Sequence, residues 1–225
     1  MQHGARGSPA PPFFLTEMTK KATAPKFERI APDERRARLV EASIACLAKG
    51  GIQGFTVDNI CAEAGTSRGL ITHHFGSKNA LLAAAYAAIY GKVLDKLDRA
   101  ETTPQSIDEL VDMIFADSFL SRDYLNVWLA LWGEIAVNPV LQAEHRKNYA
   151  LYRERIARAI SAFARGKGVT VDSYDVATIL ISLIDGLWLE QCIDQSLLSL
   201  ERAKDLCRRT LAAVLAPAGY EKRRR

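Results

Sequence analysis

The residues best equipped for chemistry lie in one short stretch, Ser67 to Lys78, which combines a guanidinium, two imidazoles, hydroxyls and an ammonium group. If this stretch begins as a helix, polar and apolar side chains fall on opposite faces. The polar face carries Arg68, Gly69, Thr72 and His73, and the apolar face carries Leu70, Ile71 and Phe75. Such a face suits hydrogen bonding to a large partner. A metal or catalytic pair at His73 and His74 is disfavoured, because adjacent residues on a helix point apart.

No arrangement of residues in the sequence is typical of an enzyme's active site. We find no Ser/His/Asp order, no paired carboxylates at a working spacing, no phosphate loop and no cluster of metal ligands. The cysteines, which lack C-x-x-C spacing, fall in apolar helical patterns: Cys46, Cys61, Cys192 and Cys207. We therefore expect buried, reduced thiols and a cytoplasmic protein with no enzymatic activity, no metal and no cofactor.

The elements before this stretch are predicted by caps and glycines. Pro32, followed by two acidic residues, begins a helix that stops at Gly50-Gly51. Thr56 caps a short helix from Val57 to Ala64. Gly65 ends that helix, because glycine permits the positive φ that a tight turn needs.

The polar stretch itself supplies the next two helices. Ser67 caps a helix that Gly76 ends, and Ser77 caps a long helix reaching about Arg99. Two short helices joined by a glycine turn, packed on a preceding helix, place the second helix in the major groove of DNA. Residues 56–75 therefore predict a DNA-binding helix-turn-helix.

Helical periodicity continues to the end of the chain without strand alternation, so the predicted fold is all-α. Ser106-x-x-Glu109 is a capping box for a helix to about Leu120. Four more helices are predicted: Tyr124 to Val137, Pro139 to Arg165, Ser173 to Asp194 and Ser199 to Leu215. We expect a disordered extension (1–30), a three-helix DNA-binding domain (31–80), a larger helical domain (81–217) and a basic tail (218–225). Met18 is an alternative start of translation to Met1.

Charge and hydropathy agree with a soluble DNA-binding protein. Residues 20–78 carry ten Lys and Arg against six Asp and Glu, whereas residues 81–221 carry fifteen against nineteen. This asymmetry indicates that the N-terminal part meets a polyanion. No run of about eighteen apolar residues lacks a charged or strongly polar group, so we expect no membrane partner. The apolar run near the N-terminus is too short for the core of a signal peptide.

The run Gly65-Thr-Ser-Arg-Gly-Leu-Ile-Thr-His-His-Phe-Gly-Ser-Lys-Asn-Ala-Leu-Leu82 resembles the DNA-binding signature of the tetracycline-repressor (TetR) family. The resemblance covers about fifty residues, from Arg38 to Ala88, and it implies a set of DNA-binding residues. The set is Thr56, Ser67, Arg68, Gly69, Thr72, His73, His74 and Lys78.

Every member of this set except Ser67 carries an implied role of its own. Thr56 holds a phosphate at a helix N-terminus, and Arg68 reads guanine through paired donors. Gly69 allows close approach, and Thr72 contacts a thymine methyl group or a phosphate. His73, His74 and Lys78 contact the DNA backbone. Many relatives have Tyr at the position of Thr72, so the base contact there differs.

The larger domain resembles the choline-responsive (BetI-like) branch of the family in two segments, Trp128 to Glu134 and Ile184 to Glu190. Trp128 and Trp132 lie four residues apart, on one helix face. Tryptophan rings attract quaternary ammonium groups by about 2 kcal/mol or more each when water is excluded. The implied ligand site comprises Trp128, Trp132, Glu134, Asp185 and Trp188, with Glu190 as an alternative carboxylate. The alternative for the tryptophans is a purely structural place in the core.

The last two helices have wide apolar faces, which indicate burial against a partner or within the monomer. These faces comprise Ile179, Leu180, Leu183, Ile184, Leu187 and Trp188, then Leu206, Leu211 and Val214. The resemblance to the TetR family implies that these two helices form a homodimer. We therefore predict a DNA-binding transcriptional regulator, a repressor released from double-stranded operator DNA by a small-molecule effector, possibly cationic. The alternatives are a helical interaction module and a regulator without an effector.

Overall fold

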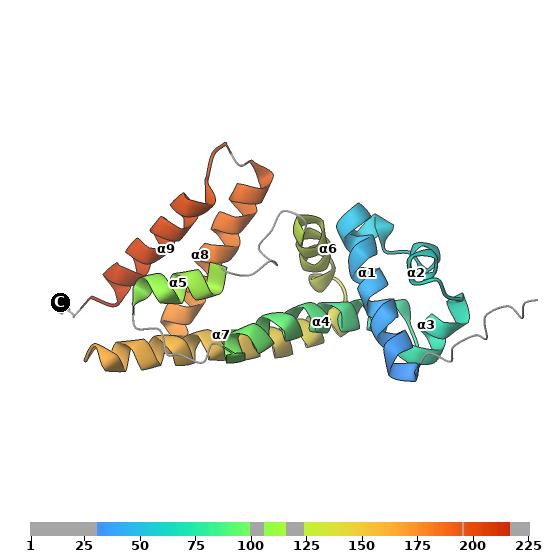
Figure 1. Ribbon diagram of the computed structural model, residues 1–225, viewed down its shortest axis with the longest axis horizontal. Coiled ribbons are helices and arrows are strands. Elements are labelled where there is room, and N and C mark those ends of the chain that lie inside the picture. Colours follow the sequence, from blue (N-terminus) through green and yellow to red (C-terminus); the bar gives the residue numbers. More distant parts are fainter. Residues whose placement is uncertain (1–30, 100–105, 116–123, 195, 217–225) are drawn as a thin grey trace, which may run out of the picture. The chain divides into compact units, whose positions relative to one another are not determined.

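The computed structural model describes residues 31–99, 106–115, 124–194 and 196–216, and every regular element within these ranges is an α-helix (Figure 1). The all-α prediction is therefore confirmed. The helices are α1 (Pro32–Gly54), α2 (Val57–Ala64), α3 (Arg68–Phe75), α4 (Lys78–Arg99), α5 (Ile107–Phe115), α6 (Leu125–Ile135), α7 (Pro139–Gly166), α8 (Ser173–Ile193) and α9 (Leu200–Val214). The predicted extension (1–30), the basic tail (218–225) and the continuation of α5 to Leu120 lie outside the described residues.

Local capping signals set most of the helix boundaries. The Thr56 hydroxyl accepts a hydrogen bond from the Asn59 amide at 3.2 Å, and Ser106 accepts one from the Glu109 amide at 3.1 Å. The prediction for Ser67 was wrong in one respect. It occupies the N-cap position of α3, but its side chain makes no capping hydrogen bond.

The predicted stop at Gly50-Gly51 is a kink. Both glycines have non-helical dihedral angles, and helical structure resumes up to Gly54. Just before this kink, the side-chain amide of Asn126 on α6 donates a hydrogen bond to the Ala48 carbonyl oxygen at 3.0 Å. This hydrogen bond ties α6 to the end of the regular part of α1.

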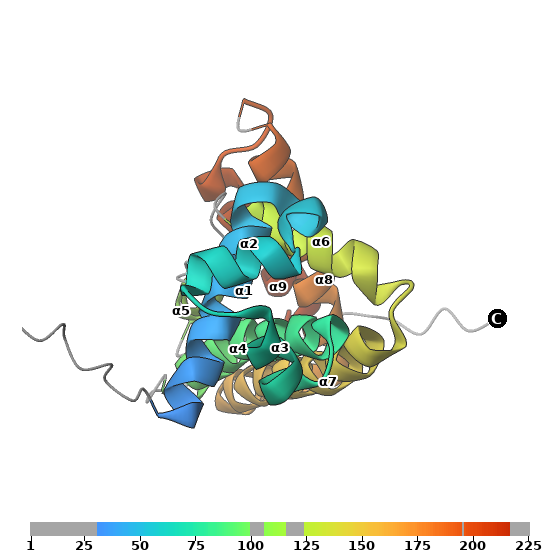
Figure 2. The same ribbon diagram turned by 90° about the vertical axis from the view of Figure 1, so that its right-hand side faces the viewer.

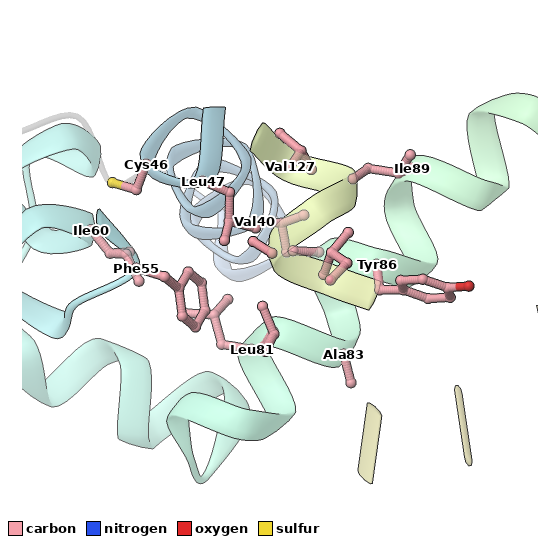
Figure 3. Packing of buried hydrophobic residues seen from close by; sticks show 14 of the residues in the cluster. Val40, Cys46, Leu47, Phe55, Ile60, Leu81, Ala83, Tyr86, Ile89 and Val127 are labelled. Carbon is pink, nitrogen blue, oxygen red and sulfur yellow. The ribbon is translucent and has the colours of Figure 1, made fainter. Parts of the chain in front are cut away.

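One apolar core joins the three N-terminal helices to α4 and α6 (Figure 3). Phe55, between α1 and α2, is fully buried and lies against Leu81 in the first turn of α4. Complete burial of a side chain of this size stabilises the fold by roughly 1.5–3 kcal/mol. Contributions also come from more distant helices, through Leu141 of α7 and Trp188 of α8. The N-terminal helices are thus packed directly on the elements that form the rest of the molecule.

A second apolar core lies among α5, α7, α8 and α9. Its fully buried members include Leu110, Val111, Ile156, Ile160, Ala177 and Cys207. The four cysteines are buried free thiols, as predicted. Helix α7 runs beside α4, so it contacts both cores (Figures 1 and 2).

Helix α8 has the length and apolar composition of a membrane-spanning helix. Its sequence nevertheless includes Asp185, and its Val176, Leu180 and Ile184 are buried among the other helices. Core helices of water-soluble proteins commonly share this composition. We therefore interpret α8 as a core helix.

Candidate nucleic-acid interface and aromatic cluster

The turn between α2 and α3 depends on Gly65. This residue has φ 62° and ψ 41°, in the left-handed region that L side chains rarely adopt. It allows the Thr66 amide to donate to the Cys61 carbonyl at 2.9 Å, which closes the end of α2. The expectation for Gly65 is confirmed, and the turn fixes the direction in which α3 leaves α2.

Helix α3 exposes the side predicted to be polar. Arg68, Gly69, Thr72 and His73 are all exposed, whereas Ile71 is only 3% exposed. Leu70 and Phe75 are half-buried against the first core. A Cβ atom added to Gly69 would meet no described atom within 4 Å, so the protein's own packing does not require glycine there. The surface of α3 is therefore open for a partner.

The two histidines lie closer together than predicted. Their ring centroids are 4.9 Å apart and the rings meet edge to face. His73 is exposed and His74 is half-buried. The expectation that these side chains point apart was wrong, because the two rings are in edge-to-face contact.

Two further contacts hold the cations of this surface, and the sequence reasoning missed both partners. Arg68 forms an ion pair with Asp58 of α2 at 2.5 Å, with both side chains more than half exposed. Such an exposed pair contributes about 1 kcal/mol or less, so a polyanion can displace Asp58. Lys78 donates from Nζ to the Phe55 carbonyl at 3.2 Å and lies 5.5 Å from the Phe55 ring centroid. Lys78 therefore joins the start of α4 to the segment before Thr56.

The three tryptophans of the predicted ligand site come together. Trp128 and Trp132 on α6 have ring centroids 6.1 Å apart, and Trp132 lies 5.9 Å from Trp188 of α8 at an interplanar angle of 88°. Trp128 and Trp188 are buried, and Trp132 is half-buried.

Tyrosines from α4 and α7 extend this group, and we did not predict them. The Tyr90 ring lies 5.6 Å from Trp128 and 6.0 Å from Tyr152, and Tyr86 lies 4.8 Å from Tyr90. We call the connected rings of Tyr86, Tyr90, Trp128, Trp132, Tyr152 and Trp188 the aromatic cluster. The Tyr86 hydroxyl is hydrogen-bonded to Nδ1 of His145 at 2.7 Å. Burial lowers the pKa of His145, which favours a neutral ring.

Asp185 is the carboxylate that belongs to this cluster. Burial raises its pKa to about 6. Its charge in turn contributes to raised pKa values of tyrosine hydroxyls, including Tyr90, whose pKa burial and Asp185 bring to about 12. Within the described parts of the chain, Asp185 has no ion pair and no side-chain hydrogen bond. Asp185 is a half-buried acid without a counter-ion among the described residues, and its charge acts on the hydroxyls of Tyr86, Tyr90 and Tyr149.

The other proposed carboxylate is not connected to the cluster in this way. Glu134 is half-buried near the end of α6, and none of the ion pairs among the described residues involves its carboxylate. Glu190, the alternative acid, is exposed. Of the three acids, the structure brings only Asp185 into electrostatic contact with the cluster tyrosines.

Comparison with known proteins decides the family. Residues 39–85 match the family described as "Bacterial regulatory proteins, tetR family", and residues 104–216 match "BetI-type transcriptional repressor, C-terminal". The chain belongs to the TetR family, with a C-terminal region of the BetI type. It is a DNA-binding transcriptional regulator, so the predicted fold class and the predicted regulatory function are confirmed.

Individual relatives agree with this assignment. The regulator BetI of Escherichia coli K12 is 29% identical over 180 residues, which is 77% of this chain and 90% of that protein. BetI of Burkholderia cenocepacia is 29% identical over 161 residues, 69% of this chain and 80% of that protein.

Solved structures give the same result. A transcriptional regulator from Pseudomonas aeruginosa PAO1 has a TM-score of 0.73 and 34% identity, covering 84% of this chain and 93% of that one. A regulator from Saccharomonospora viridis in complex with choline has a TM-score of 0.64 and 27% identity, covering 80% and 95%.

Proposed function

We propose that this TetR-family protein is a homodimeric repressor that dissociates from operator DNA when it binds a small cationic effector of the choline type. The observation that carries the proposal is the aromatic cluster with Asp185. It combines electron-rich rings with a half-buried carboxylate, and it includes side chains of α4, the helix that follows the helix-turn-helix. The predicted division into a DNA-binding domain (31–80) and an effector domain (81–217) is part of this proposal.

The DNA-binding half of the proposal places α3 in a major groove. Arg68 reads guanine, after it exchanges Asp58 for base acceptors. Gly69 lets the backbone approach closely, and Thr72 contacts a thymine methyl group or a phosphate. Ser67, which has no capping hydrogen bond to its own helix, is free to donate its hydroxyl.

Phosphates are held around this helix. Thr56 binds one at the N-terminus of α2, where free amides and the helix dipole favour an anion. His73, His74 and Lys78 bind others. Lys78 also has a structural role, because its hydrogen bond to the Phe55 carbonyl positions the residue that precedes Thr56.

The effector half rests on cation–π attraction. A quaternary ammonium group takes up no hydrogen bonds, so rings and one carboxylate satisfy it fully. The ionised form of Asp185 gains a counter-ion from such a ligand and recovers part of what burial costs it. The ring walls are supplied by Trp128, Trp132 and Trp188. Glu134 is retained as a further ligand residue at the end of α6. The S. viridis regulator, which shares the fold, contains choline.

The route from effector to DNA is short in this proposal. Trp128 and Trp132 belong to α6, and α6 is hydrogen-bonded to α1 through Asn126 and Ala48. Tyr86 and Tyr90 of the cluster belong to α4. An effector that moves these rings therefore acts on α1, through α6, and on α4 directly. These are the two helices that flank the helix-turn-helix in the chain. The change in DNA affinity is then limited by the difference between the effector's affinities for the DNA-binding conformation and for the released conformation.

Dimer formation is proposed for α8 and α9. Ile179, Gly186 and Ile193 repeat every seven residues on α8, and all three are exposed in the monomer. Ile193 is 60% exposed and Ile179 is 47% exposed, so a second protomer that covers this stripe would remove apolar surface from water. A twofold dimer binds two half-sites spaced by about 34 Å or a multiple of it. A cytoplasmic location is part of the proposal, because a transcriptional regulator acts on DNA and because the four cysteines are free thiols.

Effector binding is tested with choline and its neutral isostere 3,3-dimethylbutan-1-ol, in which carbon replaces the charged nitrogen. Tryptophan fluorescence of the full chain is measured during titration with each compound. We expect choline to change the emission saturably and the isostere to bind at least tenfold more weakly, since it lacks the charge. Equal affinity for the two compounds, or no response to choline, would contradict the cationic site.

DNA binding is tested separately on the intergenic DNA upstream of the protein's own gene. Footprinting is expected to show a protected site with twofold pseudo-symmetry. Protection that is absent, or that is identical on a shuffled duplex, would contradict the operator proposal without bearing on the effector.

A further inference from the structure

Arg36 lies on the first turns of α1, outside the helix-turn-helix, and its guanidinium rests on the recognition helix. Its Cζ atom is 4.8 Å from the ring centroid of Phe75, the last residue of α3. The N-terminal end of α1 lies beside α3 in both views of the ribbon (Figures 1 and 2). Arg36 is exposed, whereas Phe75 is half-buried. The ring therefore supports the guanidinium from below and leaves its N–H groups facing solvent.

None of the acidic side chains in the described part of the chain pairs with Arg36. Its neighbour Arg38 pairs with Glu34 at 2.8 Å on the same helix. Arg36 has no ion pair within the described residues, and Asp33, one turn before it, is not within ion-pair distance. The two arginines thus have different surroundings although they are only two residues apart.

The position of this cation fits a recognition helix that lies in the major groove. The N-terminal residues of such a helix contact the base edges. Arg68 is the first residue of α3, whereas Arg36 lies against Phe75, the last. A guanidinium at that far end is set away from the base edges, where the phosphate backbone borders the groove.

We propose that Arg36 binds a DNA phosphate, so that α1 is a third element of the DNA interface. The inference rests on the proposed placement of α3 in the major groove. The Phe75 ring orients the guanidinium before DNA arrives, and this lowers the entropy lost when the phosphate is bound. A phosphate contact of this kind adds affinity on every sequence and carries no base preference.

The test compares Arg36→Met with Arg38→Met, because methionine keeps much of the apolar bulk and removes the charge. DNA affinity is measured between 50 and 200 mM salt, on the upstream duplex and on a shuffled duplex. Each lost phosphate contact makes the slope of log K against log salt less steep by about 0.9. For a dimer losing two contacts, the fall in affinity over this range shrinks by about twelvefold. Arg38→Met is expected to keep the wild-type slope.

The outcomes separate a phosphate contact from a structural one. A wild-type slope in Arg36→Met, even with weaker binding, would overturn the proposal and leave Arg36 as a packing residue. An equal change of slope in Arg38→Met would overturn it as well, since any loss of charge would then have the same effect. The wild-type footprint and the base preference of Arg68→Ala report on the groove placement itself, so failure of that placement is recognised independently.

Discussion

Replacing Asp185 by Asn is expected to make the protein more stable and less able to bind a cation. The side chain keeps nearly the same size, but it no longer ionises. In the folded protein, burial raises the pKa of Asp185 from 3.8 to about 6. The folded state therefore binds this proton more tightly than the unfolded state does. The ionised carboxylate costs stability at neutral pH.

The size and sign of the effect follow from this shift. Each pKa unit corresponds to 1.36 kcal/mol, so a shift of about two units corresponds to about 3 kcal/mol. Below pH 4 the carboxyl group is neutral in both states and costs nothing. As pH rises from about 4 to about 6, the unfolded state loses its proton first and the folded state becomes less stable. Above pH 6 the full cost is present.

Urea denaturation at one protomer concentration measures the effect. Asp185→Asn is expected to exceed the wild type by up to about 3 kcal/mol at pH 7.5 and to match it near pH 4. Glu190→Gln, which removes an exposed carboxylate from the same helix, serves as the control and is expected to follow the wild type at both pH values. In parallel, choline affinity is expected to fall in Asp185→Asn, and in the wild type as pH drops through 6.

Two results would refute this reasoning. A variant that is less stable than the wild type at pH 7.5 would mean that Asp185 has a stabilising partner. A variant with unchanged choline affinity would mean that the carboxylate does not face the ligand.

Three further predictions concern the turn, the interface and the dimer. Gly65→Ala is expected to cost about 1–2 kcal/mol in urea denaturation, because alanine is strained at φ 62°; an unchanged midpoint would contradict a rigid turn. Arg68→Ala is expected to lose about 1–3 kcal/mol of binding free energy on the operator and to relax the base preference, whereas Lys78→Ala is expected to weaken binding to all duplexes alike. Both variants are measured in the same DNA-binding assay, and the reverse pattern would contradict the roles assigned to these two residues. Ile179→Glu is expected to give a monomer in light scattering, whereas Val140→Glu, at a similarly exposed site on α7, leaves the dimer intact; a dimeric Ile179→Glu would exclude this face.

Local chemistry explains why the N-terminal helices were predictable. Thr56 and Gly65 define the ends of α2 through interactions within a few residues, and the predicted range from Val57 to Ala64 is confirmed. A hydroxyl cap and a positive φ need no knowledge of the rest of the fold. Ser67 shows the limit of such signals, because occupying the cap position does not ensure the hydrogen bond.

Contacts between distant helices were harder to predict. Trp128 and Trp132 were recognised by their spacing within one helix, but Tyr86 and Tyr90 have the same spacing on α4 and were missed. Nothing in a helical period indicates that α4 packs against α6. Likewise, the sequence places Asp185 one turn before Trp188 but does not choose among the three acids. That choice depends on the burial of Trp188 and on the effect of the Asp185 charge on Tyr86 and Tyr90, which come from other helices.

The central claim is that the aromatic cluster and the DNA surface are coupled, and reciprocal binding measurements test it most directly. Choline affinity is measured with and without the upstream duplex, and affinity for the duplex is measured with and without saturating choline. The account predicts that each ligand weakens the other by the same factor, in the range of about 5–150-fold typical of such coupling. Binding of both ligands with affinities that are independent of each other would contradict it.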